Sequence, residues 1–518
     1  MIDRVADARV QSSRVRLGDP NVSLLFIALL LGLGLRLWMI FGPFARLDVD
    51  EAIVGLMARH AAHGKFSAFF WGQEYGGTQE QLLAAPVVAL AGAREWALRL
   101  VPTAQTALAT WLVWRVGRRT VGEPAARLAA VVFWIFPGVY VWWSIKPRGF
   151  YETQVVIGLT VLLLCLQLAE KQSGVTAALL GFVAGLGVWA SPNIAYFALP
   201  AVVWLLLRDW RLVRYTGVAV GAAIVGALPW LYHNVGSGWA SLDTGNSAIS
   251  YAESLKVFFR TSLPVTLGLR HPNPAGLSAS ITDTNSTWIV PGLAVVVYLV
   301  LLAAFVWLCI RRPAGTELLI LVAGLFPLIF ALQPFAAFAV AEPRYLYFLA
   351  PIVSLLLARA LVAMRLFLVG IVLFCVLSVA GSVTFVHLAE RSPGDMFMPT
   401  NLSPLVTLTS RHHVRDVFAP YNFAFRLTFM TQEHVIATPI EAFIARYLPY
   451  QSVVRASAAP AYAFVRHGPG DQYFGPALAR KHVPYQRFAA GGYVLYVLDR
   501  RVMPEEFPGL GALGMGLS

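Results

Sequence analysis

The sequence predicts a polytopic α-helical membrane protein with a small α/β domain at its C-terminal end. Of its 518 residues 58% are hydrophobic and 13% are charged, and the mean hydropathy is +0.65. Soluble domains contain about 25% charged and about 45–50% apolar residues. Long apolar runs recur as far as residue 388, and shorter β-branched and helical runs alternate after it.

Eleven segments have the length and apolar character of a membrane-spanning helix, which needs about 20 residues. They lie near 23–44, 95–115, 125–143, 153–169, 175–191, 194–208, 213–233, 288–310, 316–335, 343–362 and 366–388. The first run is longer than the apolar core of a signal peptide and has no small-residue cleavage site, so we interpret it as a retained span.

Basic residues set the predicted orientation. If residues 1–22 are cytoplasmic, four of the five cytoplasmic loops are basic, as the positive-inside rule requires. The long loops 45–94 and 234–287 and the tail 389–518 then face the exterior of an inner or plasma membrane. The net charge of +13 therefore reflects topology, and we expect membrane lipids rather than nucleic acid as partners.

The tail 389–518 predicts a soluble extracytoplasmic α/β domain. The runs VRDVFAP, HVIATP, APAYAFVRH and GGYVLYVLDR are typical of strands, and NFAFRLTFMTQ and PALARKH look helical. Strands that alternate with helices favour an α/β arrangement. Residues 23–388 would then form the transmembrane catalytic domain.

An acidic motif follows the first span, in a sequence otherwise poor in charge. Asp48, Asp50 and Glu51 open RLDVDEAIVGLMAR, whose apolar residues have helical spacing. We expect an amphipathic helix in the membrane interface. The acids either cap this helix or include a catalytic base.

A second acidic stretch in the same outer loop, FFWGQEYGGTQEQ, carries Glu80, which can point back at the first motif. Its two adjacent glycines permit a tight turn. Trp71 and Tyr75 are candidates for stacking on a sugar or for the membrane interface.

Two later outer loops place charged and aromatic residues next to spans. These are Lys146, Arg148 and Glu152 in one loop, and Glu342, Arg344 and Tyr345 in the other. The cations either bind an anionic substrate or have structural roles, Lys146 and Arg148 as interfacial anchors and Arg344 as the partner of Glu342.

Carboxylates that face cations at a membrane surface suit one transfer reaction. A carboxylate removes a proton from an acceptor hydroxyl, the oxygen attacks a sugar carbon, and a phosphate departs. A general base contributes about 10²–10⁴-fold, and cations stabilise the charge of the leaving phosphate.

These motifs resemble the GT-C glycosyltransferase superfamily, and within it glycosyltransferase family 39. The resemblance covers about 45–388. It rests on Asp48-Val-Asp-Glu51 after the first span, on Glu80, and on Arg344-Tyr345 at a late span. It implies a polyprenyl-phosphate sugar donor and an inverting transfer to an extracytoplasmic lipid, glycan or protein acceptor.

The resemblance also implies roles for individual residues. The family's Asp-Glu pair maps onto Asp50-Glu51, although Asp48 leaves the identity of the base open; we favour Asp50. Lys146, Arg148 and Arg344 would bind the donor phosphate, and loop 234–287 would cover the donor as a lid.

A cofactor cannot be assigned from the sequence. Relatives that use a metal leave a divalent cation open, and His233 and His271 are either its ligands together with Glu80 or solvated side chains. The three cysteines lie in apolar runs and indicate neither a disulfide framework nor a Cys-based metal site.

A transporter or flippase for a lipid-linked substrate is the main alternative, and a non-catalytic assembly protein is another. Transporters place ionisable groups near the bilayer midplane. Here Arg36 is an exception among spans that are otherwise nearly free of charge, and most acids lie in outer loops.

Overall fold

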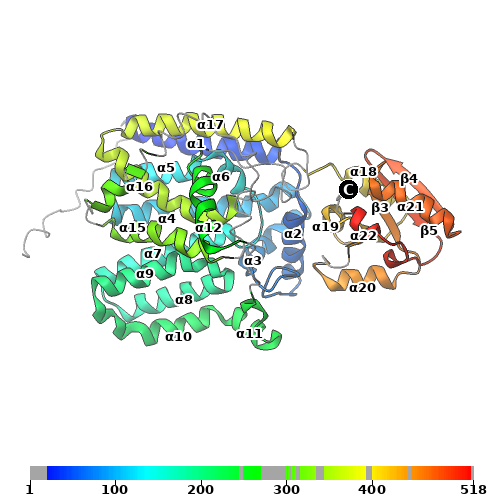
Figure 1. The fold of residues 1–518 in the computed structure, drawn as a ribbon, viewed down its shortest axis with the longest axis horizontal. Coiled ribbons are helices and arrows are strands. Elements are labelled where there is room, and N and C mark those ends of the chain that lie inside the picture. The colour runs from blue at the N-terminus through cyan, green and yellow to red at the C-terminus, as the bar shows by residue number, and fades with distance from the viewer. Residues whose placement is uncertain are drawn as a thin grey trace, which may run out of the picture.

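The computed structural model describes residues 20–243, 249–269, 299, 302–303, 305–310, 315–333, 343–391, 399–441 and 445–514. A bundle of apolar helices forms the larger part of the protein, and an α/β unit lies at one end of it (Figure 1). The long bundle helices are α1 (Pro20–Phe41), α4 (Glu95–Thr120), α5 (Glu123–Ile135), α7 (Tyr151–Glu170), α8 (Gly174–Ala190), α9 (Ala195–Arg208), α10 (Thr216–Gly226), α11 (Leu228–Ser237), α15 (Glu317–Ala331), α16 (Ala350–Ala363) and α17 (Phe367–Arg391).

Four helices in the described part of the chain are long and apolar enough to cross a membrane: Val22–Phe41, Tyr151–Glu170, Arg344–Ala363 and Phe367–Glu390. Shorter apolar helices cover Gly174–Ala190, Pro192–Arg208 and Glu317–Ala331. The predicted count of eleven spans stays a prediction, because the one near 288–310 lies largely outside the described residues.

Two predicted spans are not single straight helices. The run 125–143 is divided into α5 and the short helix α6 (Gly138–Trp143) at Phe136-Pro137. Proline has no N–H to donate and disfavours helical geometry at the residue before it, so the helix ends there. The run 213–233 bends by 66° between Trp210–Gly226 and Leu228–Ser237.

Loops that the charge pattern assigns to one side of the membrane contact one another. Gln172 Nε2 donates to Asp209 Oδ2 at 2.8 Å, and the Tyr215 hydroxyl donates to the Gln172 carbonyl at 3.0 Å. At the other end, the Gly77 amide donates to the Ala190 carbonyl at 2.8 Å. The loops after α7 and α9 therefore lie at one end of the bundle, and the first outer loop meets the end of α8 at the other. Which end faces the exterior stays a prediction.

The α/β unit is built on a five-stranded sheet in the order β2-β1-β3-β5-β4. Strands β1 and β2, and β1 and β3, are parallel, whereas β5 is antiparallel to β3 and β4. The strands are β1 (Asp416–Ala419), β2 (Ile436–Pro439), β3 (Ala461–Val465), β4 (Tyr485–Ala490) and β5 (Tyr493–Leu498). The helices are α18 (Ser403–Arg411), α19 (Tyr421–Met430), α20 (Leu448–Ala456), α21 (Pro469–Arg480) and α22 (Leu510–Gly514).

Helices α2 (Val49–Ala62) and α3 (Gln79–Ala91) lie between the bundle and the α/β unit (Figure 1). The sequence predicts that α2 lies in the membrane interface, but its residues 51–58 are all buried. The reason is that α3, the start of α4 and α19 all pack against α2. A Cβ atom at Gly55 would come within 2.4 Å of Phe429 Cε2, so this close approach requires a glycine.

A polar contact pins the C-terminal half of α2 to the α/β unit. The Arg59 guanidinium and the Tyr450 hydroxyl donate to Glu433 at 2.8 and 2.7 Å, and His60 Nε2 lies 2.8 Å from it. Burial opposes ionisation of Glu433, but the hydrogen bonds from His60, Tyr450 and Arg59 lower its pKa to about 2. The ionised Glu433 therefore stabilises the contact at a pH above the usual pKa of glutamate. That stabilisation is lost as the pH falls towards 2.

We expect Glu433→Gln to loosen the α/β unit without unfolding it, because the substitution removes the charge that Arg59 faces. Amide hydrogen exchange in α19 and the second half of α2 should increase severalfold at pH 7. Asp499→Asn, in an exposed turn of the same unit, is the control. Unchanged exchange in Glu433→Gln would show that this contact does not hold the unit in place.

Candidate functional site

The acidic motif begins α2 with a reciprocal pair of hydrogen bonds. Asp48 Oδ1 accepts from the Glu51 amide at 3.0 Å, and Glu51 Oε2 accepts from the Asp48 amide at 2.7 Å. This capping box satisfies two backbone donors that a helix start leaves without partners. The capping alternative is thus correct for Asp48 and Glu51, but it leaves most of their acceptor capacity for other groups.

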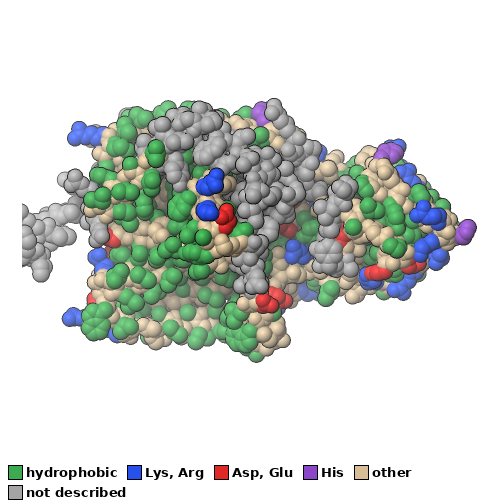
Figure 2. All heavy atoms as spheres, viewed as in Figure 1, with side chains coloured by type: hydrophobic (Ala, Val, Ile, Leu, Met, Phe, Trp, Pro, Cys, Tyr) green, Lys and Arg blue, Asp and Glu red, His purple; other side chains and the backbone are tan. Residues whose placement is uncertain are grey.

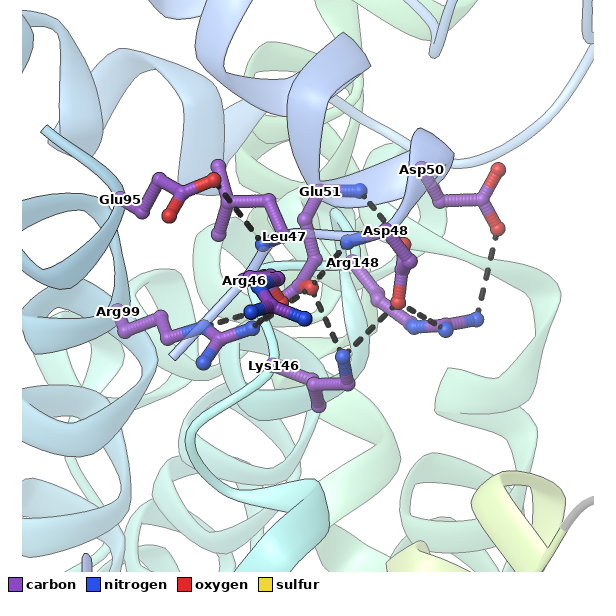
Figure 3. Close-up of polar contacts among 9 residues, drawn as sticks. All are labelled: Arg46, Leu47, Asp48, Asp50, Glu51, Glu95, Arg99, Lys146 and Arg148. Atoms are coloured by element: carbon purple, nitrogen blue, oxygen red, sulfur yellow. Dashed lines mark hydrogen bonds and ion pairs between the residues drawn. The ribbon is translucent and has the colours of Figure 1, made fainter. Parts of the chain in front are cut away.

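That capacity is taken by three cations, in what we call the charge cluster (Figure 3). Lys146 Nζ donates to Asp48 Oδ2 at 2.9 Å and to Glu51 Oε2 at 2.8 Å. Arg148 also donates to Asp48 Oδ2, and Arg99 donates to both Glu51 oxygens at 3.1 and 3.0 Å. These five side chains are at most 2% exposed, so water does not screen the ion pairs.

Asp48 is a poor candidate for the base in this environment. Burial opposes its ionisation, but the charges of Arg148 and Lys146 and the hydrogen bond from the Glu51 amide hold its pKa well below the usual range. A carboxylate stabilised in this way has little tendency to accept a proton. Because it is also only 1% exposed, it cannot meet a substrate without rearrangement of the cluster.

Asp50 differs from its two neighbours in being accessible. Its side chain is 24% exposed, and Arg148 NH1 lies 3.5 Å from Oδ2. The other oxygen, Oδ1, accepts a hydrogen bond from the Tyr421 hydroxyl of α19 at 3.3 Å. Asp50 is thus the carboxylate of the motif that faces outwards, next to an arginine that orients it.

The loop that carries Lys146 and Arg148 is held from both sides. On one side Arg36 of α1 donates to the Ser144 hydroxyl at 2.9 Å, and its guanidinium carbon lies 3.7 Å from the centre of the Trp134 ring. On the other side the Gly149 amide donates to Glu80 Oε1 at 3.1 Å. Arg36, the charged residue of the first span, therefore helps to hold this loop in place.

Glu80 lies behind the charge cluster rather than at its surface. Its side chain is completely buried, and Glu152, also buried, is an electrostatic neighbour. Burial and the charge of Glu152 raise the pKa of Glu80 well above its usual range, although the Gly149 hydrogen bond opposes this. The structure thus brings Glu80 towards the cluster, as expected, but places it where it positions the loop.

Arg344 and Tyr345 form a second cationic group with Tyr75. Arg344 NH2 donates to the Tyr345 hydroxyl at 3.3 Å, and the Arg344 guanidinium lies 5.8 Å from the ring centre of Tyr151. Burial raises the pKa of Tyr75, whose hydroxyl is within electrostatic range of Tyr345, Arg344 and Asp50. Tyr75 is therefore within electrostatic range of both the acidic motif and the late-span arginine.

Trp71 is not brought to the site. It is 5% exposed and stacks on Tyr447 of the α/β unit, with ring centres 3.9 Å apart. Its ring therefore serves the contact between the two parts of the protein.

No metal centre is formed by the residues that the structure describes, since no three or more His, Cys, Asp or Glu side chains gather there to hold an ion. His233 Nε2 lies 2.6 Å from Glu74 rather than beside Glu80. His271 and Glu342 lie outside the described residues, so the pairing of Glu342 with Arg344 stays a prediction.

Sequence reasoning missed three residues of the site. Arg99 could have been found, because an arginine within an apolar span calls for a partner. Tyr421 and Arg446 give no such signal, because they are 371 and 396 positions from Asp50 along the chain. The packing of α19 on α2 brings Tyr421 to Asp50, and Arg446, which follows α19 in the chain, binds Tyr421.

Comparison with known proteins supports the fold. A family model described as dolichyl-phosphate-mannose-protein mannosyltransferase matches residues 81–233, and no curated protein matches the chain. The structure is similar to that of ArnT from Cupriavidus metallidurans in the apo state, with a TM-score of 0.59 and 14% identity over 92% of this chain and 97% of that one. For ArnT bound to undecaprenyl phosphate the TM-score is 0.56, with the same identity and coverage. The predicted GT-C fold is thus confirmed.

We expect Lys146→Met to destabilise the protein by about 3–5 kcal/mol, because it leaves Asp48 and Glu51 buried with less positive charge. Asp48→Asn in the same background should recover part of this loss by removing one of the two charges. Thermal unfolding in detergent measures both effects. Lys65→Met, at an exposed lysine, is the control, and a Lys146→Met protein as stable as the control would contradict the role of the cluster.

Proposed function

We propose that this GT-C-fold protein is a membrane glycosyltransferase that moves a sugar from a polyprenyl-phosphate donor to an extracytoplasmic acceptor. The observation that carries the proposal is the contrast within one motif: Asp48 and Glu51 are locked in buried ion pairs, and Asp50 beside them is accessible. The ArnT-like fold and the mannosyltransferase family model that matches residues 81–233 support the proposal.

Asp50 acts as the general base in the proposed reaction. It accepts the proton of the acceptor hydroxyl, whose oxygen attacks the anomeric carbon of the sugar. The bond from that carbon to the phosphate oxygen breaks, and its electron pair leaves with the polyprenyl phosphate. Attack opposite the leaving group inverts the anomeric carbon, and no general acid is needed, because a phosphate is a weakly basic leaving group.

The donor phosphate binds between Tyr75 and Arg344 in this proposal. Arg344 is partly exposed, and Tyr75 is within electrostatic range of both Arg344 and Asp50. Arg148 contributes from behind Asp50, whereas Lys146 is fully buried between two carboxylates and supports the site indirectly. A phosphate monoester carries a charge of about −1.5 to −2 at pH 7, so these cations stabilise the leaving group more than the bound donor.

An apolar groove near the 3₁₀ helix that carries Arg344 suits the isoprenoid chain of the donor. A cavity of about 430 Å³ lies between α15, α16 and the helical segment 258–266, and its lining is apolar apart from one glycine. Leu349 lines the groove and lies five residues after Arg344, in the 3₁₀ helix Pro343–Leu349. At about 2 Å per residue, this places the arginine about 10 Å from the groove.

A lipid transporter is less well supported. The charge cluster and Asp50 lie where α2 caps one end of the bundle (Figures 1 and 3), whereas transport requires a polar path through the middle of the spans. The first long loop that the charge pattern assigns to the exterior, 45–94, lies at the same end with α2 and α3 (Figure 1), which supports an extracytoplasmic site and α/β unit. The identity of the sugar and the acceptor is left open, as is the use of a divalent cation.

We expect Asp50→Asn to lower kcat for sugar transfer by about 10²–10⁴-fold, because the amide keeps the shape of the side chain but cannot accept the proton. The measurement is transfer of label from undecaprenyl-phosphate-linked sugars to a membrane lipid extract by the purified full-length protein. Glu253→Gln, at an exposed carboxylate that pairs with Lys256, should retain activity. Full transfer by Asp50→Asn would exclude Asp50 as the base.

We expect Gly324→Phe to fill the groove and to raise KM for a long-chain donor about tenfold. A Cβ at Gly324 meets no atom within 4 Å, so the phenyl group has room to enter the space meant for the isoprenoid chain, where each lost CH₂ contact costs about 0.8 kcal/mol. A donor with a single isoprene unit should be unaffected. Gly221→Phe on α10, where space is also open, is the matched control; equal effects on both donors would place the chain elsewhere.

A further inference from the structure

The α/β unit reaches the proposed base through one side chain. Tyr421 is the first residue of α19, and its hydroxyl donates to Asp50 Oδ1 at 3.3 Å. The same hydroxyl accepts a hydrogen bond from Arg446 Nε at 3.2 Å. Arg446 NH1 in turn lies 3.5 Å from the Gly72 carbonyl in the first outer loop. Tyr421 is thus held at Asp50 by a residue of its own unit.

The position of Tyr421 is fixed by the packing of α19 on α2. The two helices start at the same end, with Tyr421 beside Asp50, and Glu433 meets Arg59 at the other end. Between these contacts, the Phe429 ring lies over Gly55. Because contacts at both ends hold α19 against α2, the Tyr421 hydroxyl can move little. Its contact with Asp50 is therefore a consequence of the fold.

The contact has the geometry that the proposed reaction demands of an acceptor. An acceptor hydroxyl must donate to the base from about 2.6–3.2 Å, and the Tyr421 hydroxyl already occupies this place at slightly longer range. Burial, and next the charge of Asp50, raise the pKa of Tyr421, so the hydroxyl stays protonated and donates without giving up its proton.

We propose that Tyr421 occupies the acceptor-hydroxyl position at Asp50 until an acceptor displaces it, and that it thereby prevents hydrolysis of the donor. This rests on the proposed function. In the reaction that it suppresses, a water oxygen attacks the anomeric carbon and the bond to the phosphate oxygen breaks. The water proton passes to Asp50, and free sugar and polyprenyl phosphate are released. Tyr421 is a positioning and specificity residue, since it controls what reaches the base.

Arg446 keeps a hydrogen bond to the Tyr421 hydroxyl after an acceptor displaces that hydroxyl from Asp50. Its bond to Tyr421 does not involve Asp50, so it can persist when an acceptor takes over the hydrogen bond to the carboxylate. The long contact with Asp50 is the one that breaks, because a hydrogen bond at 3.3 Å lies beyond the usual O–H···O distance of 2.5–3.0 Å. The acceptor therefore has to replace only the longer hydrogen bond of Tyr421, the one to Asp50.

The test compares hydrolysis with transfer in the full-length protein. The donor is the undecaprenyl-phosphate sugar, labelled in the sugar, that the wild type transfers to a membrane lipid extract. Without the extract, Tyr421→Phe should release free labelled sugar about tenfold faster than the wild type, since a long hydrogen bond to a charged group is worth about one factor of ten. With the extract, KM for the acceptor should fall by a similar factor, and kcat should change less than about twofold.

Tyr450→Phe is the matched control. It removes a hydroxyl that donates to Glu433 in the same interface, at the opposite end of α2 from Asp50. If Tyr421→Phe acted by loosening the α/β unit, both variants would raise hydrolysis, and equal rises would overturn the proposal. Unchanged hydrolysis in Tyr421→Phe, or loss of transfer in a folded Tyr421→Phe protein, would also overturn it.

The double variant Tyr421→Phe/Asp50→Asn separates this inference from the proposed function. If both hold, adding Asp50→Asn removes the extra hydrolysis. Failure of the wild type to transfer sugar from any labelled undecaprenyl-phosphate donor, or full transfer by Asp50→Asn, contradicts the proposed function itself. Normal dependence on Asp50 without a rise in hydrolysis in Tyr421→Phe contradicts only the role of Tyr421.

Discussion

The buried ion pairs of Asp48 and Glu51 hold together three segments that are distant in the sequence. An ionised carboxylate without a partner is very costly to bury, and breaking one buried pair costs about 3–5 kcal/mol. The start of α2, the start of α4 and the loop after α6 must therefore meet with Lys146, Arg148 and Arg99 in place. The stability of this arrangement is electrostatic, and its geometry is set by hydrogen bonds with defined directions.

This constraint explains how one short motif combines structural and chemical roles. Residues three positions apart lie on the same face of a helix, so Asp48 and Glu51 both face the cations. Asp50, which lies between them in the sequence, faces outwards. Asp48 positions Arg148, which then lies beside Asp50. The accessible carboxylate is thus held by neighbours that do not themselves meet the substrate, an arrangement that preorganises a reactive group without exposing its supports.

The α/β unit is part of the same system rather than an independent appendage. Aromatic stacking of Trp71 on Tyr447 and the polar contacts of Glu433 fix it against α2. Through α19 it brings Tyr421 to Asp50. In the proposed enzyme, the unit that shapes access of the acceptor is therefore mechanically coupled to the helix that carries the base.

The sequence by itself determined the membrane-bundle class, the GT-C resemblance and the clustering of the acidic motif with Lys146 and Arg148. These follow from local signals: the length of apolar runs, the sign of loop charges, and ionisable residues placed next to spans. It also located four strands of the sheet, and it missed β4, whose side chains are mostly exposed and show no apolar alternation.

Only the tertiary structure decided which carboxylate is accessible and which residues surround it. In the sequence alone, three acidic residues within four positions cannot be told apart. Their burial and their hydrogen-bond partners distinguish them, and both depend on segments far along the chain. The same holds for the burial of α2, for Trp71, and for Tyr421 and Arg446, which reach the site through the packing of α19. Contacts across hundreds of residues depend on how apolar surfaces fit together, and a single sequence carries no local sign of that fit.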